Sequence, residues 1–441
     1  MYRFVKRNIE YVILTFLYLW IGFCAIYNMG IVAEIVFILC VTCLAKISAR
    51  ASFCVMISLL FTSMSSLNMS SPIIITSGII FLFNLKKFRL KGKHVLFSNL
   101  VIPFFFYFLI RFLDGLFVKS ENLYNDAIAV DFISLLSICL AVLLITEKSD
   151  VVFVERWVGL LGVLATVFGF FYFLNNETAY LGQLYSDTNF AGKGVVGDDI
   201  VKSWLRWVPI DKEPNFWAAY LLFPFGFWLH AVVKKTSFMS MLCLAITYLG
   251  ILFSYSRSSF VVSSFVLFYV IFTNKKQYFI KILLAFVLVF VCVSLYSPEV
   301  VDRIFSINDN IKSEGGSGRF ELWKEAVVNF LSNPFFGIGT GQTPMYSPSH
   351  LGTHNLYLQI LGENGILGFS VFLFIWLTAL SRMKRYIRVN SFYFYGFLGF
   401  SINLMTVHCF DLRIPLFVIA LFYVSEHTIT SSNRNCGIVS I

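Results

Sequence analysis

Apolar segments long enough to cross a lipid bilayer recur along almost the whole chain. The candidate spans are residues 10–27, 30–47, 52–67, 72–84, 97–113, 128–146, 152–174, 214–233, 237–253, 258–273, 279–296, 363–381, 391–407 and 413–427. The segments 52–67 and 72–84 are short, so they are either two crossings or one broken hairpin. Because a helix needs roughly 20 apolar residues to cross the hydrocarbon core, we predict an all-α polytopic membrane protein with about 12–14 transmembrane helices.

Composition agrees with this class of protein. The 441 residues are 58% hydrophobic and 13% charged, whereas a soluble domain is about 45–50% apolar and about 25% charged. The nine cysteines lie mostly inside apolar runs without a CxxC pair, which indicates small buried side chains and neither a disulfide framework nor a metal site. The net charge of +10 is spread over short links between the spans, so nucleic acid is not an expected partner.

The basic residues fall on alternate links between the spans. If the N-terminus is cytoplasmic, the inner links carry Lys87, Lys148, Lys234, Lys275 and Arg382, whereas the short outer links carry almost no basic residues. This is the positive-inside pattern. We therefore predict an even number of spans with both termini in the cytoplasm, and a first helix that is retained rather than cleaved as a signal peptide.

Two long polar intervals interrupt the apolar runs, and this topology places both on the outer face. The predicted organisation is N-terminal transmembrane helices over 1–174, a first outer loop over 175–213, transmembrane helices with a serine-rich turn over 214–296, a large outer loop over 297–362, and C-terminal transmembrane helices with a cytoplasmic tail over 363–441. The second interval is the longest polar stretch of the chain and holds most of the residues suited to chemistry.

Two arginines of the outer face are candidate anion ligands. Arg257 lies between serines at the end of an apolar helix, where it either snorkels at the membrane boundary or meets a lipid phosphate. Arg319 follows a glycine-rich segment and begins a helix that Asn333 and Pro334 end. An arginine in the first turn opposes the helix dipole at a cost of about 0.3–1 kcal/mol, which suggests a use beyond the surface role of many arginines.

The helix that begins at Arg319 has an amphipathic pattern. The side chains expected to be buried are Phe320, Trp323, Val327, Phe330 and Leu331.

His354 is a candidate general base. It follows Thr353, a good N-cap, and precedes a helix expected to start at Asn355, so the helix dipole should lower its pKa and keep it neutral. The alternative is an ordinary capping or interfacial histidine. His350 lies four residues earlier, but no carboxylate stands at ligand spacing, and we expect no metal site.

A glycine-rich turn and an acidic residue flank this histidine. Gly337, Gly339 and Gly341 form a turn that could bring backbone close to a ligand, although no strand precedes it as a nucleotide fold would require. Glu363 precedes Gly365, a predicted helix C-cap, and is expected either to hold the neighbourhood of His354 or to be solvated.

Several short motifs follow one another in a fixed order through this half of the chain. They are EPNFWA over 213–218, SYSRSS over 254–259, GRFELW over 318–323, NPFFGIG over 333–339, HNLYLQ over 354–359 and ENGILG over 363–368. In this order they resemble the O-antigen ligase and polymerase superfamily, over about residues 200–370.

The resemblance implies a bacterial inner-membrane glycosyltransferase of the all-helical C type, which uses an undecaprenyl-diphosphate-linked glycan at the periplasmic face. It implies inversion at the anomeric carbon and neither a metal nor another cofactor. The family's diphosphate-binding arginines fall on Arg257 and Arg319, and its essential histidine falls on His354. Substrate contacts are expected from Arg206, Asn215, Gly337, Gly339, Asn355 and Glu363.

Three functions remain open at this point. The first is a polymerase that joins lipid-linked repeat units, and the second is a ligase that transfers finished glycan to lipid A-core. The third is a flippase or exporter, which would be expected to bury polar residues along a path through the membrane. The expected partners are the lipid-linked donor, a glycan or lipid A-core acceptor, membrane lipid, and a chain-length regulator and a flippase.

Overall fold

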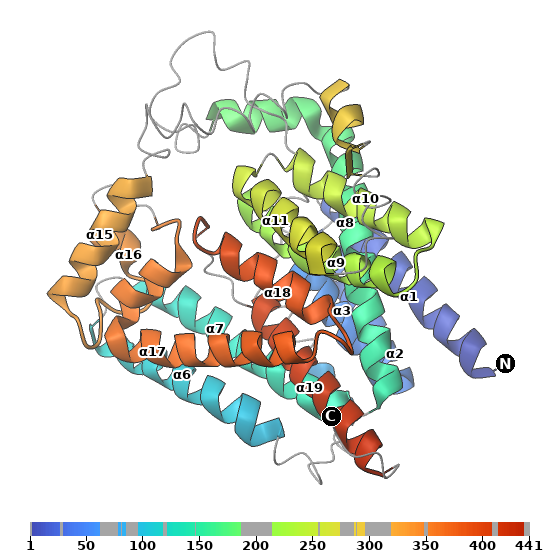
Figure 1. Cartoon of the computed structure of the whole chain (residues 1–441), viewed down its shortest axis with the longest axis horizontal. Helices are drawn as coiled ribbons and strands as arrows, with labels where there is room; N and C mark the ends of the chain where they lie inside the picture. The colour runs from blue at the N-terminus through green and yellow to red at the C-terminus, as the bar shows by residue number, and fades with distance from the viewer. Residues whose placement is uncertain are drawn as a thin grey trace.

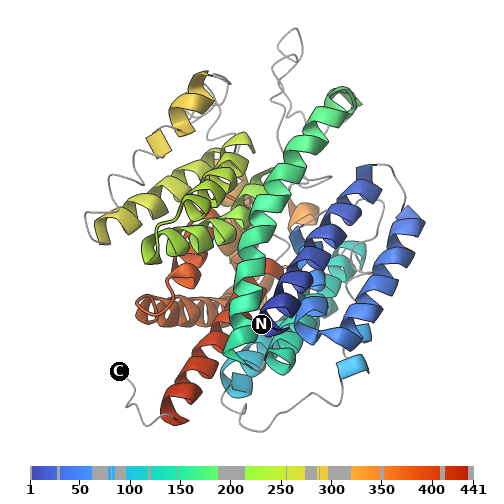
Figure 2. The same ribbon diagram turned by 90° about the vertical axis from the view of Figure 1, so that its right-hand side faces the viewer.

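The protein is described by a computed structural model in which every regular element is helical (Figures 1 and 2). The structure describes residues 2–26, 30–61, 78–80, 82–84, 96–117, 121–145, 147–186, 214–254, 256–273, 286–287, 289–295, 319–347, 352–407 and 413–435. Within these ranges there is no strand, and the predicted all-α class is confirmed.

The helices follow the predicted spans closely. They are α1 (Tyr2–Ile26), α2 (Gly30–Ile47), α3 (Ala49–Phe61), the π-helical turn η2 (Phe97–Val101), α6 (Ile102–Leu113), the short η3 (Asp114–Phe117), α7 (Glu121–Leu144), α8 (Lys148–Ser186), α9 (Pro214–Lys234), α10 (Phe238–Phe253), α11 (Arg257–Thr273), α15 (Arg319–Ser332), α16 (Thr343–Tyr346), α17 (Leu356–Arg385), α18 (Phe392–Asn403) and α19 (Arg413–Asn435). The predicted spans 72–84 and 279–296 lie largely outside the described residues.

Four helices of the described chain are long and apolar enough to cross a membrane. They are Glu121–Leu144, Lys148–Phe171, Asn215–Lys234 and Leu356–Arg385. Shorter apolar helices, among them α10 and α11, accompany these four. The chain is therefore a polytopic membrane protein, while the number of crossings stays a prediction.

Helix α8 is longer than its predicted span. It continues to Ser186 and so enters the segment from residue 175 that the sequence assigned to a loop. Residues 172–181 contain no glycine or proline, so nothing in the sequence ends the helix where the apolar run ends.

Helix α18 lies at the centre of the bundle and packs against α9, α11, α17 and α19 (Figure 1). Its closest approach is to α9 at a pair of glycines: a Cβ atom on Gly226 would lie 2.5 Å from the backbone nitrogen of Gly396. Two helices can approach this closely only where neither carries a side chain.

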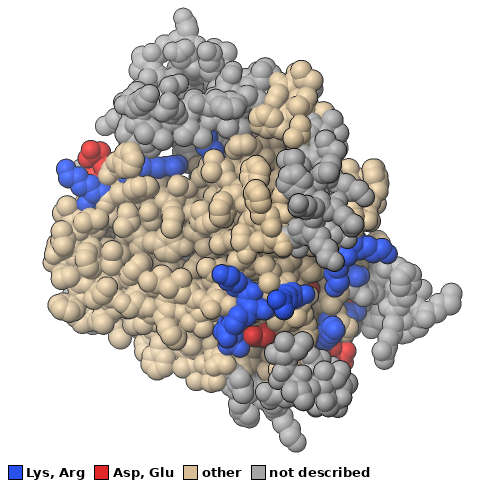
Figure 3. All heavy atoms as spheres, viewed as in Figure 1, with Lys and Arg blue, Asp and Glu red and all other residues tan. Residues whose placement is uncertain are grey.

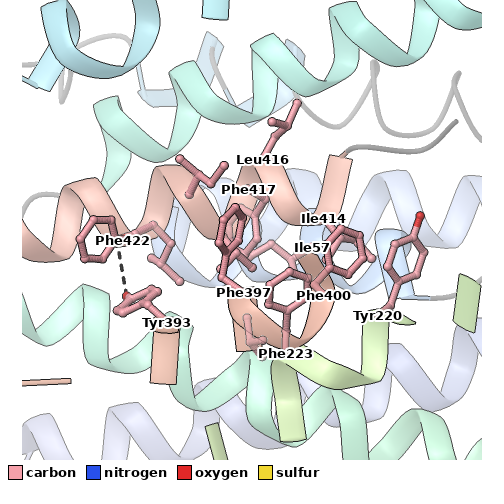
Figure 4. Packing of buried hydrophobic residues seen from close by; sticks show 14 of the residues in the cluster. Ile57, Tyr220, Phe223, Tyr393, Phe397, Phe400, Ile414, Leu416, Phe417 and Phe422 are labelled. Atoms are coloured by element: carbon pink, nitrogen blue, oxygen red, sulfur yellow. Dashed lines mark hydrogen bonds between the residues drawn. The ribbon is translucent and has the colours of Figure 1, made fainter. Parts of the chain in front are cut away.

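Aromatic side chains fill the space around this crossing. Figure 4 shows Phe223 of α9 beside Phe397 and Phe400 of α18, with Phe417 of α19 close to them. The ring centroids of Phe223 and Phe400 are 5.0 Å apart, and those of Trp376 of α17 and Phe397 are 4.5 Å apart. The middle of the bundle is thus a buried aromatic core.

One end of the bundle carries basic residues in the last turns of its helices. Basic residues occupy the last turns of α9 (Lys234) and α17 (Arg382, Lys384 and Arg385), and groups of Lys and Arg are visible in Figure 3. The other end of α17, where it begins at Leu356, meets the end of α18 through a hydrogen bond from Leu356 N to Leu404 O of 2.9 Å. This second end carries the candidate site.

Candidate active site

His354 occupies a tight turn just before α17. Its φ of 50° is the one positive φ of a non-glycine residue in the described chain. Thr353 closes the turn, because its hydroxyl donates to Asn355 O at 2.7 Å and accepts from Asn355 N at 3.2 Å. Histidine is among the residues that adopt this left-handed conformation most often, but the conformation still costs free energy.

The predicted capping of α17 is wrong by two residues. The N-cap is Asn355, whose side chain accepts from Leu358 N at 3.2 Å, and the helix begins at Leu356. The hydroxyl of Thr353 is engaged in the turn around His354 and is not available as a cap. Asn355, expected as a substrate contact, therefore has a structural role, and its contact with substrate stays a prediction.

The imidazole of His354 is neutral at physiological pH. Burial, together with the nearby positive charge of Arg319, lowers the pKa of His354 to about 4. The predicted direction of this pKa shift is confirmed, but the causes differ from the helix dipole on which the prediction rested. A neutral imidazole can accept a proton from a hydroxyl group.

Arg319 begins α15, and the predicted bounds of this helix are confirmed. The predicted buried face is wrong. Leu322, Ala326 and Asn329 are buried, whereas Phe320, Val327 and Leu331 are exposed, and Trp323 and Phe330 lie between these classes. The reason is that α15 packs on α17 through the side that carries Leu322, Ala326 and Asn329.

Arg257 is the first residue of α11 and is linked to the His354 segment through α18. In the preceding serine turn, Ser256 Oγ donates to Ser259 Oγ at 3.1 Å, and Ser259 Oγ accepts from Asn403 Nδ2 at 2.8 Å. Leu404, the residue directly after α18, accepts a hydrogen bond from Leu356 N at the start of α17. The SYSRSS turn and the HNLYLQ segment, far apart in sequence, therefore meet at one end of the bundle.

The glycine turn contacts the backbone of α17. Ile338 N donates to Gly362 O at 3.0 Å, and Gly339 N donates to Glu363 O at 2.9 Å. A Cβ atom on Gly337, whose φ is 77°, would lie 2.2 Å from Glu363 O. These glycines thus allow a close approach within the protein, while the ligand contact predicted for Gly337 and Gly339 stays a prediction.

Glu363 holds this turn in place. Its buried carboxylate accepts from Gly341 N at 3.0 Å, from Thr343 Oγ1 at 2.7 Å and from Gln359 Nε2 at 3.1 Å. The carboxylate of Glu363 is therefore buried and not solvated, and the partners described here are groups of the protein. Its expected contact with substrate stays a prediction.

The helix α17 is broken two residues later. Gly365 has φ 61° and ψ −166°, which is not helical, and the predicted end of a helix at this glycine is confirmed as a kink. A Cβ atom there would lie 2.4 Å from the backbone of Phe335. Only glycine adopts this conformation at little cost.

A buried polar network surrounds the kink. Asn364 donates to Asp114 Oδ2 at 2.6 Å and accepts from Arg111 at 3.2 Å, and Arg111 pairs with Asp131 of α7 at 2.5 Å. Thr340 of the glycine turn donates to Asp114 at 3.4 Å. Burial raises the pKa of Asp114 to about 6, although these donors favour its charged form. The network joins α6 and α7 to the site.

The remaining predicted residues are placed as follows. Asn215 lies half-buried in the first turn of α9, and Arg206 and His350 lie outside the described residues. In the described part of the chain, no group of three or more His, Cys, Asp or Glu side chains could hold a metal ion. The structure therefore brings Arg257, Arg319 and His354 to one end, without a metal centre among the residues it describes.

The fold and the site define a class of protein: a multi-pass membrane protein with two arginines and a neutral histidine at one end of its helix bundle. Residues 241–373 match the family described as O-Antigen ligase, and this match supports the resemblance of the chain to the O-antigen ligase and polymerase superfamily. The matched range runs from α10 into α17 and so includes Arg257, Arg319 and His354. A search of curated proteins finds no relative of this chain.

Proposed function

We propose that the protein is a glycan polymerase that transfers an undecaprenyl-diphosphate-linked oligosaccharide to the end of another such glycan. The observation that carries the proposal is the pairing of Arg319 with a neutral His354 in the part of the chain that matches the O-antigen ligase family. A cation for the leaving diphosphate and a base for the attacking hydroxyl are what such a transfer needs.

In the proposed reaction, a hydroxyl oxygen of the acceptor sugar attacks the anomeric carbon of the donor. The new bond to oxygen forms as the bond from the anomeric carbon to the diphosphate breaks, so the configuration inverts. His354 takes the proton of the hydroxyl group. Arg257 and Arg319 neutralise the charge that develops on the lipid diphosphate as it leaves.

The proposed orientation puts the site on the periplasmic face of the bacterial inner membrane. It is supported by the basic last turns of α9 and α17, which lie away from the end where α17 begins. Cysteines placed at the exposed positions Glu321 and Lys384 test it in intact cells. A membrane-impermeant maleimide should label the first and not the second, and the reverse pattern would overturn the orientation.

A ligase that transfers finished glycan to lipid A-core is the second candidate, favoured by the description of the matched family. A deletion of the gene separates the two. Loss of the polymerase should leave lipid A-core carrying a single repeat unit, and this is the expected result. Loss of the ligase would leave the core bare, with long glycan on undecaprenyl diphosphate. An unchanged size distribution would contradict both.

A flippase or exporter is the candidate from another class, and the described core argues against it. Phe223, Phe397, Phe400 and Trp376 fill the middle of the bundle between its two polar ends. A transporter needs polar side chains along a path at that depth. Purified protein in lipid vesicles should therefore extend a lipid-linked glycan without any second compartment.

We also propose that the transfer is independent of metal ions. The test is the same purified reaction with a chelator present, which should leave the rate unchanged. Loss of activity that added Mg²⁺ or Mn²⁺ restores would overturn this part of the proposal.

A further inference from the structure

Helix α15 has an apolar face that no described part of the protein covers. Phe320, Val327 and Leu331 are 52%, 42% and 67% exposed, and their spacing puts them on one side of the helix. The opposite side carries the buried residues Leu322 and Ala326, which face α17. α15 therefore has two apolar faces, of which the described part of the protein covers one.

The exposed face continues beyond the helix. Phe335 and Phe336, in the turn after α15, are 64% and 55% exposed. This turn is bonded to α17, because Ile366 N donates to Pro334 O at 2.8 Å. Ile366 is itself 41% exposed and begins the apolar piece of α17 after its kink.

That piece of α17 belongs to a candidate membrane span, Leu356–Arg385. Its exposed apolar side chains, such as Phe374 at 67%, are those that face lipid in a membrane-spanning helix. The apolar face of α15 and its turn is therefore continuous with a lipid-facing surface.

Charge is distributed along α15 in a way that fits a membrane interface. Arg319, Glu321, Lys324 and Glu325 lie in its first two turns, whereas residues 326–347 contain no charged side chain. Figure 3 shows charged groups near one end of α15 and an uncharged surface over the other. Lys324 shares the exposed face, where a long basic side chain can reach lipid phosphate.

We propose that α15 is an interfacial helix whose later turns, together with Phe335 and Phe336, are immersed in the lipid leaflet at the His354 end. The occupant of the apolar face is the hydrocarbon of bulk membrane lipid. A second protein copy is less well supported, because the face runs without interruption into the surface of a span. Lipid contact then fixes Arg319, at the start of the same helix, at the height of the phosphates.

The test uses the full-length protein in vesicles of phosphatidylethanolamine and phosphatidylglycerol. The photoreactive residue benzoylphenylalanine replaces Leu331 or Phe335 in separate variants, Phe374 as the lipid-facing reference, and Glu321 as the control on the charged part of α15. After irradiation, mass spectrometry counts phospholipid adducts. We expect Leu331 and Phe335 to give adducts at a yield close to that of Phe374 and several-fold above that of Glu321.

Two outcomes would overturn the proposal. One is a yield at Leu331 and Phe335 no higher than at Glu321. The other is a covalent dimer in place of the lipid adducts, which would make the face an interface between copies. The readout needs no glycan substrate, so it stands or fails separately from the proposed transferase activity.

Discussion

The two ends of the bundle each bury a glutamate, but the two carboxylates have different partners. Glu155 of α8 accepts from Tyr393 at 2.5 Å and from Asn390 at 3.0 Å, so its partners are side chains of α18 and of the link before it. Glu363 accepts from Gly341 N and from Thr343 as well as from its own helix. The carboxylate of Glu155 joins two helices, whereas the carboxylate of Glu363 fixes the conformation of the glycine turn.

Two half-buried histidines, one near each end of the bundle, differ in the same way. His230 lies within the regular helix α9, and its Nδ1 is 2.8 Å from Ser391 Oγ. His354 lies in a left-handed turn and is influenced by the charge of Arg319. His230, in a regular helix with a serine as its partner, has the features of a residue that stabilises packing. His354, on a strained backbone beside a cation, has the features of a catalytic residue.

Removal of each histidine in turn should have the largest effect on transfer. His354→Ala should lose about 10²–10⁴-fold in transfer rate, the usual contribution of a general base. His230→Ala, the matched control, should retain its rate per folded molecule. Transfer is measured with purified protein and a lipid-linked donor. Near-normal activity of His354→Ala would assign the proton transfer to another group.

The two glutamates give the next largest effect. Glu363→Gln removes the negative charge and replaces one of the two acceptor oxygens with an amide nitrogen, which cannot accept from Gly341 N or Thr343 Oγ1. Each hydrogen bond to a buried charge contributes about 1.5–3 kcal/mol. Glu363→Gln should lower both the melting temperature and the transfer rate. Glu155→Gln should lower the melting temperature alone. If both variants lost activity in proportion to stability, the distinction between the two ends would be wrong.

Two glycines make a similar pair with a smaller expected effect on activity. Gly365→Ala puts a side chain on a residue with positive φ, and its Cβ atom would lie 2.4 Å from the backbone of Phe335. The Cβ atom of Gly226→Ala would lie 2.5 Å from Gly396 N. Strain of this kind costs about 1–3 kcal/mol. Both variants should unfold at lower temperature, but only Gly365→Ala should also slow transfer at a temperature where the protein is folded. Equal rates of the two variants would contradict this.

The smallest expected effect is a shift in the pH profile. Because His354 must be neutral to accept a proton, the wild-type rate should fall only as the pH falls toward about 4. Arg319→Gln removes a cation that lowers the pKa of His354, so its residual activity should be lost at a higher pH; the change should be modest because burial is the larger cause of the lowered pKa. Arg319→Lys keeps the charge and should not shift. If the acidic side of the pH–rate profile of Arg319→Gln stayed where it is in the wild type, the proposed effect of Arg319 on the pKa of His354 would be wrong.

The helices were predictable because hydropathy alone selects segments that can cross a bilayer. The bounds of α9, α10 and α15 follow the predicted ones closely, since Pro214, Ser237 and Asn333 are strong local signals for where a helix begins or ends. Such signals act within a few residues and need no knowledge of the rest of the fold.

The buried face of α15 was not predictable in this way. Its sequence has apolar residues on two sides, and only the position of α17 decides that Leu322 packs inward while Leu331 faces outward. In a soluble protein the more apolar face is the buried one, but beside a membrane that face can meet lipid instead.

The network around Asn364 was hidden for another reason. Its partners Arg111 and Asp114 lie about 250 positions earlier, and no pattern in one sequence connects them. Asn364 read on its own is an ordinary residue of a helix turn. The signal that could have found it is the presence of Arg111 and Asp131 in apolar segments, where an ionised side chain needs a partner.

The left-handed backbone of His354 has a consequence for chemical rescue. Glycine adopts a φ of 50° more readily than alanine does, so His354→Gly relieves strain and leaves an imidazole-sized space beside Arg319. Free imidazole added to that variant could enter the space and accept the proton in place of the lost side chain. The glycine variant should therefore be rescued better than the alanine variant, which makes this turn a position where the base can be supplied from solution.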